Sequence, residues 1–183
     1  KSRINSGCRF NTGKYITPMK LNRSTIIWSP KKITMQLNWI LKKFNELTPV
    51  ELYRILQLRN EVFVLEQNCV YQDADDKDQL SLHFCGWDNE KLVAYTRIIP
   101  PGISYTEASI GRVVTSPVYR KTGAGRMLMQ ESISHTFSRF NCPVIKIGAQ
   151  VYLTKFYQSL GFVQSSEPYL EDGIAHIEMI LHK

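Results

Sequence analysis

The sequence predicts a single domain of the α/β or α+β class, built on a mixed β-sheet. Its 183 residues are one domain's length, and 43% of them are hydrophobic, which is enough to bury a core. Short apolar runs with a period of two alternate with runs of helical spacing, in the order β-α-β-β-β-α-β-α-β. Such an order packs helices against a mixed sheet. Because charges interrupt every apolar stretch, we expect no membrane partner.

The first predicted elements are a strand and a helix. Residues 36–44 alternate apolar and polar side chains, as in a strand with one buried face. Thr48 and Glu51 form a capping box around Pro49, which predicts a helix running to about Val62.

The middle of the chain reads as a loop followed by three strands. Residues 72–79 hold four aspartates and little apolar content, which predicts a solvated loop. Residues 80–87 and 92–99 are predicted strands joined by a turn. Residues 109–115 form a third β-rich run, which ends before Pro117.

The last third predicts two helices and two strands. A helix from about residue 125 to 140 carries a buried stripe at helical spacing: Met129, Ile133, Phe137 and Phe140. A strand at 144–149 and a short helix at 152–160 follow, with Gly161 as the residue that ends the helix. Residues 176–181 form the terminal strand, and residues 162–165 are a candidate extra strand.

The positive charge is concentrated in the first 34 residues. The chain has a formal net charge of +7, but residues 1–34 carry eight basic side chains and no acidic one. The remainder is therefore close to neutral, and no basic face interleaved with aromatic residues follows, so we expect no nucleic-acid partner. We assign residues 1–34 to a basic leader and 35–183 to the folded domain. The leader is a disordered arm, a transit peptide, or upstream or vector-derived sequence.

The four cysteines, Cys8, Cys69, Cys85 and Cys142, lack the spacing of a metal site or a disulfide framework. They are expected to be reduced thiols in a cytoplasmic protein, and no metal site is predicted.

Residues 120–125, Arg-Lys-Thr-Gly-Ala-Gly, connect a predicted strand to the start of a helix. The first N–H groups of a helix have no internal partners, and the helix dipole places partial positive charge there. Glycines let an anion approach the backbone closely, so the loop is a candidate phosphate site. It is neither a Walker loop nor a complete dinucleotide fingerprint.

Tyr157 lies on the short helix after the next strand, with Leu153 and Leu160 at helical spacing. By itself it reads as a core residue. The two motifs together, Arg120-x-x-Gly123-x-Gly125 and Phe156-Tyr157-x-x-x-Gly161-Phe162, resemble the GNAT superfamily of N-acetyltransferases.

The resemblance is closest to the ElaA-like branch of that superfamily. It includes residues 59–67, 109–114 and 171–177, and it covers residues 35–183 while leaving 1–34 unmatched. It implies a mixed, mostly antiparallel twisted sheet, with a splayed central strand pair and flanking helices. It also implies acetyl-CoA as cosubstrate, and it is compatible with a homodimer.

The resemblance assigns cofactor-binding roles along one continuous segment. Backbone groups of the splayed strand would pair with the pantetheine arm, and the loop and helix start would take the pyrophosphate. The residues concerned are Val113, Val114, Thr115, Arg120, Lys121, Thr122, Gly123, Ala124, Gly125 and Arg126. A backbone N–H at Val114 or a neighbour is expected to polarise the thioester carbonyl.

Acetyl transfer to an amine also needs a base and an acid, because the amine must lose a proton and the thiolate must gain one. Tyr157 is the predicted general acid. Glu66 is the first candidate for the base, and His176 is the second, because imidazole is a common general base. His83 is expected to be structural. Side chains expected on the acceptor side are Gln67, Tyr71, Gln150, Tyr169 and Glu171.

The predicted function is therefore acetyl transfer from acetyl-CoA to a primary amine of a small molecule or peptide. One alternative is an acyltransferase like the acyl-homoserine-lactone synthases, which share part of the pattern at residues 59–66. Another is an acyl-CoA-binding domain without turnover. The sequence does not identify the acceptor amine.

Overall fold

The computed structural model describes residues 36–183, and the prediction for the basic leader at 1–34 lies outside these residues. The principal strands are β1 (Asn38–Lys43), β2 (Leu82–Asp88), β3 (Lys91–Ile99), β4 (Ala108–Thr115), β5 (Val144–Gln150) and β8 (Ile174–His182), with short strands β6 (Val163–Gln164) and β7 (Tyr169–Glu171). The α-helices are α1 (Pro49–Arg59), α2 (Ala124–Phe140) and α3 (Thr154–Gln158). None of the described helices is long and apolar enough to cross a membrane.

The strands form one sheet in the order β1-β2-β3-β4-β5-β8-β6, with β7 paired to β8. Every pairing is antiparallel except that of β4 with β5, which is parallel. The predicted fold class is confirmed. The sequence predicted β6 as a candidate strand, but it did not predict β7.

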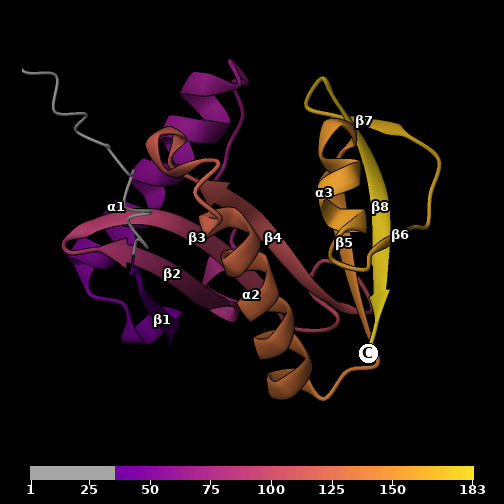
Figure 1. The fold of residues 1–183 in the computed structure, drawn as a ribbon, viewed down its shortest axis with the longest axis horizontal. Helices are drawn as coiled ribbons and strands as arrows, with labels where there is room; N and C mark the ends of the chain where they lie inside the picture. The colour runs from indigo at the N-terminus through magenta and orange to yellow at the C-terminus, as the bar shows by residue number, and fades with distance from the viewer. Residues whose placement is uncertain (1–35) are drawn as a thin grey trace, which may run out of the picture. The chain divides into compact units, whose positions relative to one another are not determined.

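The parallel pair at the centre of the sheet is splayed. β4 and β5 pair only at Ala108 with Ile145 and at Ser109 with Lys146, and then separate. Figure 1 shows the two strands diverging, so that β1–β4 and β5–β8 form the two arms of a V. The facing edges of both strands beyond this point therefore carry backbone N–H and C=O groups without a neighbouring strand.

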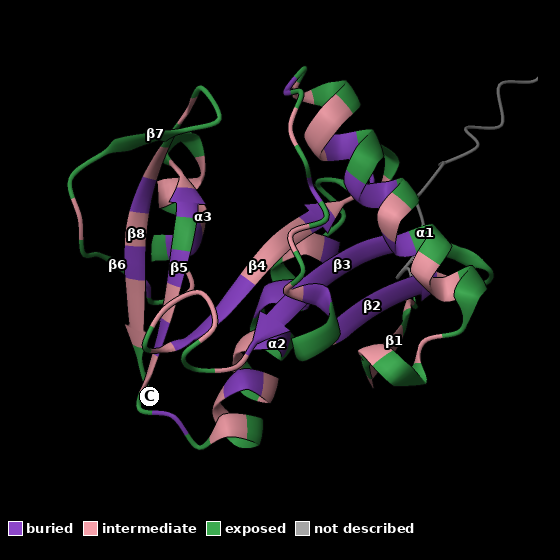
Figure 2. Cartoon of the chain, turned by 180° about the vertical axis from the view of Figure 1, so that it is seen from behind, coloured by how far each residue is buried: buried purple, intermediate pink, exposed green. Residues whose placement is uncertain are grey.

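The helices cover opposite faces of the β1–β4 arm (Figures 1 and 2). α1 packs Ile55 and Leu58 against Cys85 and Tyr95 on one face. α2 packs Leu128 against Phe84, Ala94 and Ile98 on the other. The opposite sides of each strand are thus both buried, because successive residues point to alternate faces.

The predicted capping box is present at the start of α1. The Glu51 amide donates to Thr48 Oγ1 at 3.2 Å, and the Thr48 amide donates to Glu51 Oε2 at 2.8 Å.

The helix does not stop at residue 62 as predicted: it widens into π-helical turns over Asn60–Glu66. The amide of Gln67 then donates to the carbonyl of Val62, five residues back. This extension carries Glu66 and Gln67 toward the central strands.

The acid-rich segment at residues 72–79 corrects one prediction. It is mostly loop, as expected, but it is not a solvated one, because Asp73 and Asp78 are buried. Their carboxylates pair with Arg59, which is fully buried at the end of α1. Acidic composition alone predicted solvent exposure, whereas arginines distant in the sequence draw these side chains inside.

The buried face of α2 also differs from the predicted stripe. Met129 is fully buried, but Ile133, Phe137 and Phe140 are only partly buried. The helix instead buries Leu128, Ser132 and Thr136 against the sheet.

The prediction at Gly161 is confirmed: its φ of +95° ends the short helical segment, and Phe162 packs in the core beyond it.

Candidate active site

A cleft of about 560 Å³ lies where the arms of the V separate. Predicted site residues that line it are Gln67, Tyr71, Val113, Gln150, Tyr157, Glu171 and His176. They come from the end of the π-helical extension, the loop that follows it, β4, β5, α3, β7 and β8. The splay thus brings together side chains that are far apart in the sequence. Glu66, Tyr169 and the loop at residues 120–125 do not line this cleft.

The loop at residues 120–125 has the backbone of an anion site. Lys121 and Gly123 both have positive φ, +63° and +96°, on either side of Thr122. Alternation of this kind turns successive N–H groups outward. Within the described residues, the N–H groups of Lys121, Thr122 and Gly123 donate to no protein acceptor. The loop leads directly into α2, whose dipole adds partial positive charge.

The register of β4 determines which backbone groups face the opening of the V. The Ser116 amide donates to the Val93 carbonyl at 2.8 Å, in register with the pairing of Val114 and Tyr95. Neighbouring residues turn their backbone groups to opposite edges, so Val114 bonds toward β3 and Thr115 faces the opening. We expected the N–H that polarises the thioester carbonyl at Val114 or a neighbouring residue. Because Val114 bonds toward β3, a neighbouring residue is the better placed of the two.

Tyr157 is 5% exposed and packs edge-on against Phe156 and Phe162. It nevertheless lines the cleft, and its hydroxyl makes no hydrogen bond to another described side chain or backbone group. Burial raises the pKa of Tyr157, so the phenol is protonated at neutral pH. A protonated hydroxyl beside the cleft is a proton donor.

Glu66 makes a bidentate ion pair with Arg120. Both of its oxygens lie 2.6 Å from guanidinium nitrogens, and both side chains are about two-fifths exposed, at 40% and 42%. The hydrogen bond from Arg120 holds the pKa of Glu66 below its usual value. The pair joins the π-helical extension to the loop before α2, and it leaves Glu66 a weak base.

His176 lies in β8 and stacks on Tyr169, with ring centroids 6.0 Å apart. Its Nδ1 lies 2.9 Å from the carbonyl oxygen of Ile174. A carbonyl oxygen only accepts hydrogen bonds, so in the neutral ring Nδ1 carries the hydrogen and Nε2 keeps its lone pair. His83 uses both nitrogens inside the protein, on Tyr95 Oη and the Asp78 carbonyl, and is structural as predicted.

The acceptor-side residues have different roles in the structure. Gln67 and Gln150 exchange amide hydrogen bonds at 3.2 and 3.4 Å across the two arms of the V. Tyr71 donates to Asp73 Oδ1 at 2.9 Å. Glu171 lines the cleft and is exposed, whereas Tyr169 supports His176 from outside the lining.

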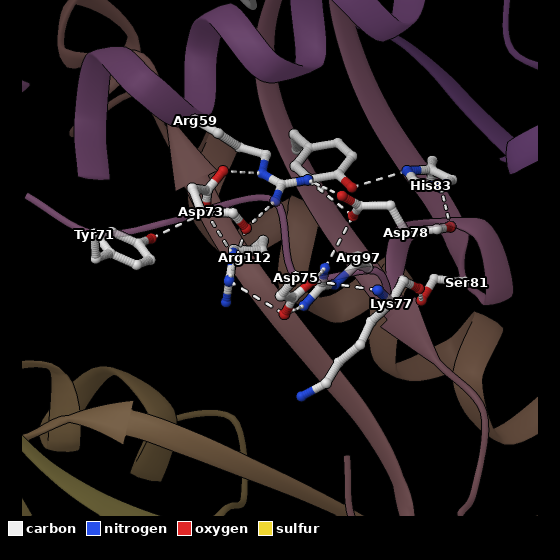
Figure 3. Close-up of polar contacts among 11 residues, drawn as sticks. Arg59, Tyr71, Asp73, Asp75, Lys77, Asp78, Ser81, His83, Arg97 and Arg112 are labelled. Atoms are coloured by element: carbon white, nitrogen blue, oxygen red, sulfur yellow. Dashed lines mark hydrogen bonds and ion pairs between the residues drawn. The ribbon is translucent and has the colours of Figure 1, made fainter. Parts of the chain in front are cut away.

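Sequence reasoning missed an ion network that forms one wall of the cleft (Figure 3). It contains three arginines and three aspartates, so its formal charges balance. The members are Arg59, Arg97, Arg112, Asp73, Asp75 and Asp78. Arg97, Arg112 and Asp75 line the cleft. The sequence contains all six residues, but nothing in their spacing indicates that they meet.

Arg112 reaches this network through a bulge in β4. Between the pairs Tyr95–Val114 and Arg97–Gly111, β4 has one residue more than β3, and Arg112 has a φ of +51°. Its Nε lies 2.7 Å from Asp73 Oδ1. The described residues contain no group of three or more His, Cys, Asp and Glu side chains that could hold a metal ion.

Comparisons with known proteins agree with this architecture. A family model described as an acetyltransferase (GNAT) domain matches residues 46–183. A UPF0039 protein of Synechocystis sp. is 42% identical over 147 residues, which cover 80% of this chain and 96% of the relative. Protein ElaA of Escherichia coli is 41% identical over 145 residues, 78% of this chain and 95% of the relative.

Solved structures give the same result. The crystal structure of Escherichia coli ElaA matches with a TM-score of 0.76 and 39% identity, covering 80% of this chain and 100% of that chain. An acyl-CoA N-acyltransferase from Pseudomonas aeruginosa matches with a TM-score of 0.76 and 38% identity, covering 80% and 99%.

Proposed function

The chain belongs to the GNAT acetyltransferase family, in the branch of ElaA and the UPF0039 proteins, and we propose that it transfers an acetyl group from acetyl-CoA to a primary amine. The family implies the use of an acyl-CoA. The observation that carries the proposal is the continuity of one segment. Among residues 36–183, an open strand edge in β4 leads into a loop whose N–H groups have no protein acceptor, and then into α2.

The cofactor would bind along this segment. The pantetheine arm, which contains amide groups, would add to the open edge of β4 at Val113 and Thr115, as an extended peptide adds to a sheet. The pyrophosphate would take the N–H groups at residues 121–125, with Arg126 nearby. The Arg120 guanidinium would then be shared between the phosphate and Glu66.

In the reaction, the neutral amine nitrogen attacks the thioester carbonyl carbon. A C–N bond forms, the C–S bond breaks, and the negative charge that develops on the carbonyl oxygen is stabilised by a backbone N–H of β4. The attacking nitrogen loses a proton to a base, and the CoA thiolate takes a proton from Tyr157. The position of Tyr157 in the cleft lining, with a hydroxyl that bonds to no other described group, supports its role as the acid.

His176 is the better candidate for the base. It lines the cleft, and its hydrogen bond to Ile174 leaves Nε2 as the proton acceptor. Glu66, ranked first from sequence, is engaged by Arg120 and lies outside the cleft lining. We assign Glu66 the role of orienting Arg120 instead.

The cofactor assignment is tested by calorimetric titration of acetyl-CoA into wild type and Gly125→Ala. A methyl group on Gly125 would lie 3.4 Å from Thr115 Oγ1, an ordinary contact, so the variant should fold normally. A pyrophosphate held closely on the N–H groups at the start of α2 would leave little room for this methyl group, so binding should weaken by about tenfold or more. Gly123 is a poorer choice, because its φ of +96° strains any side chain.

Unchanged affinity in Gly125→Ala, with an unchanged unfolding midpoint, would count against the loop as the pyrophosphate site. Turnover is tested separately, by measuring thiol release from acetyl-CoA with a broad panel of amines. Acetyl-CoA binding without release across the panel would favour the alternative of a non-catalytic acyl-CoA-binding domain.

A further inference from the structure

Lys77 brings a positive charge without a described protein partner to one wall of the cleft. It is partly buried and lines the cleft, next to an ion network whose own charges cancel. Its ammonium group forms no ion pair or hydrogen bond with any described residue. Residues 1–35 contain no acidic side chain, so the rest of the sequence supplies no carboxylate for it either.

The side chain of Lys77 is directed away from the acids that surround it in sequence. Figure 3 shows it leaving the network, with its ammonium group pointing away from Asp75 and Asp78. Both carboxylates are already engaged by Arg97, and Asp78 also by Arg59. A lysine with this placement is a ready site for an anionic group of a ligand.

The opposite wall of the cleft has the reverse polarity. Glu171 and Asp172 line it at the turn between β7 and β8, and within the described residues neither carboxylate forms an ion pair. His176 lies beside them in β8. This wall would attract an incoming ammonium group, which would then lose its proton near His176 Nε2.

Tyr105 belongs to the wall that holds His176. It lines the cleft, and a methyl group placed on Gly148 of β5 would lie 3.2 Å from the hydroxyl oxygens of both Tyr105 and Tyr169. Tyr169 in turn stacks on His176. Lys77, Tyr105 and His176 thus line one cleft of about 560 Å³, a volume in the range of small-molecule sites.

We propose that the acceptor is a free amino acid, or a similar small amine that also carries a carboxylate, with its amine toward His176 and its carboxylate on Lys77. This inference rests on the proposed acetyltransferase function. A single lysine matches the single negative charge of a carboxylate, whereas a phosphate would leave charge unbalanced. Amines without an anionic group would leave the Lys77 charge uncompensated, and so would the amine end of an extended peptide.

The test compares amino acids with the amines that result from their decarboxylation. Thiol release from acetyl-CoA is measured for matched pairs such as L-phenylalanine with 2-phenylethylamine, and L-leucine with 3-methylbutylamine. In the wild type, kcat/KM for the preferred amino acid should exceed that of its decarboxylated partner by about tenfold or more, the effect of one charge-assisted hydrogen bond.

Lys77→Met should remove this preference through KM, because the lysine lies away from the reacting atoms. The decarboxylated amine should keep its kcat/KM within about threefold of wild type, and Lys77→Glu should disfavour the amino acid further. The backbone contacts of Lys77, with Asp75 and with the Ser81 hydroxyl, do not depend on its side chain. Lys43→Met, on the exposed end of β1, is the matched control and should retain the wild-type preference.

Equal or better turnover of the decarboxylated amines by the wild type would overturn the inference and leave the acetyltransferase function intact. An equal loss for both members of each pair in Lys77→Met would also overturn it. Absence of thiol release with every amine tested would reject both the acceptor class and the proposed function.

Discussion

The loop before α2 and the acid-rich loop before β2 both contain several charged residues. The two loops differ in whether these residues are exposed or buried. Residues 120–123 are exposed, and three of their backbone N–H groups have no partner in the part of the chain that the structure describes. At residues 73–78 two aspartates are buried and every aspartate of the network is paired with arginine. The first loop leaves the N–H groups that the proposed pyrophosphate site requires unengaged within the described residues, whereas the second uses its charges to hold the wall of a cleft.

The comparison also explains where each kind of charge comes from. The candidate anion site is local, because its cations, glycines and helix start are consecutive in the sequence. The ion network is assembled from α1, β3, β4 and the acid-rich loop. Burial alone would raise the pKa of Asp78, but Arg59 and Arg97 outweigh it and hold the pKa below its usual value. Removing one charged partner should therefore lower the free energy of unfolding strongly in the network and only slightly in the loop.

Arg59→Met should give the largest effect. It leaves Asp73 and Asp78 buried with fewer partners, which should lower the free energy of unfolding by about 3–5 kcal/mol. Urea denaturation at neutral pH measures it. Arg54→Met, on the exposed side of the same helix, is the matched control and should change stability by less than about 0.5 kcal/mol. Equal effects of the two variants would mean that the network does not stabilise this wall.

Tyr157→Phe should come next in size and should act on the chemistry alone. Loss of a general acid should lower kcat by about 100-fold, while the ring keeps its packing against Phe156 and Phe162. Acetyl-CoA affinity, measured by titration, should stay within about twofold of wild type. If turnover on a verified acceptor is unchanged, Tyr157 takes no part in proton transfer.

The smallest loss of activity is expected for Glu66→Gln, and we compare this variant with His176→Gln. An exposed ion pair contributes about 0–1 kcal/mol, so Glu66→Gln should weaken acetyl-CoA binding by no more than about fivefold and leave kcat nearly unchanged. His176→Gln should lower kcat by about 100-fold. The reverse order of kcat losses would restore Glu66 as the base and end the assignment of His176.

Much of the fold could be predicted because its determinants are local. The capping box at Thr48 and Glu51, the alternation in the strands and the positive-φ glycine at Gly161 each specify their own segment. Where prediction failed, a partner distant in the sequence decided the outcome. The expected solvated loop at residues 72–79 is drawn inward by three arginines, and α2 is rotated relative to its expected stripe by the sheet beneath it.

The same division applies to the site. The sequence by itself determined the family, the candidate loop for the pyrophosphate and the presence of Tyr157 near the end of the domain, because these are short consecutive motifs. Only the tertiary structure decided that β4 and β5 separate, that Glu66 meets Arg120, and that Lys77 and His176 line one cleft. Those relations depend on long-range pairing and on burial. Both bring together residues whose spacing along the chain does not predict that they are in contact.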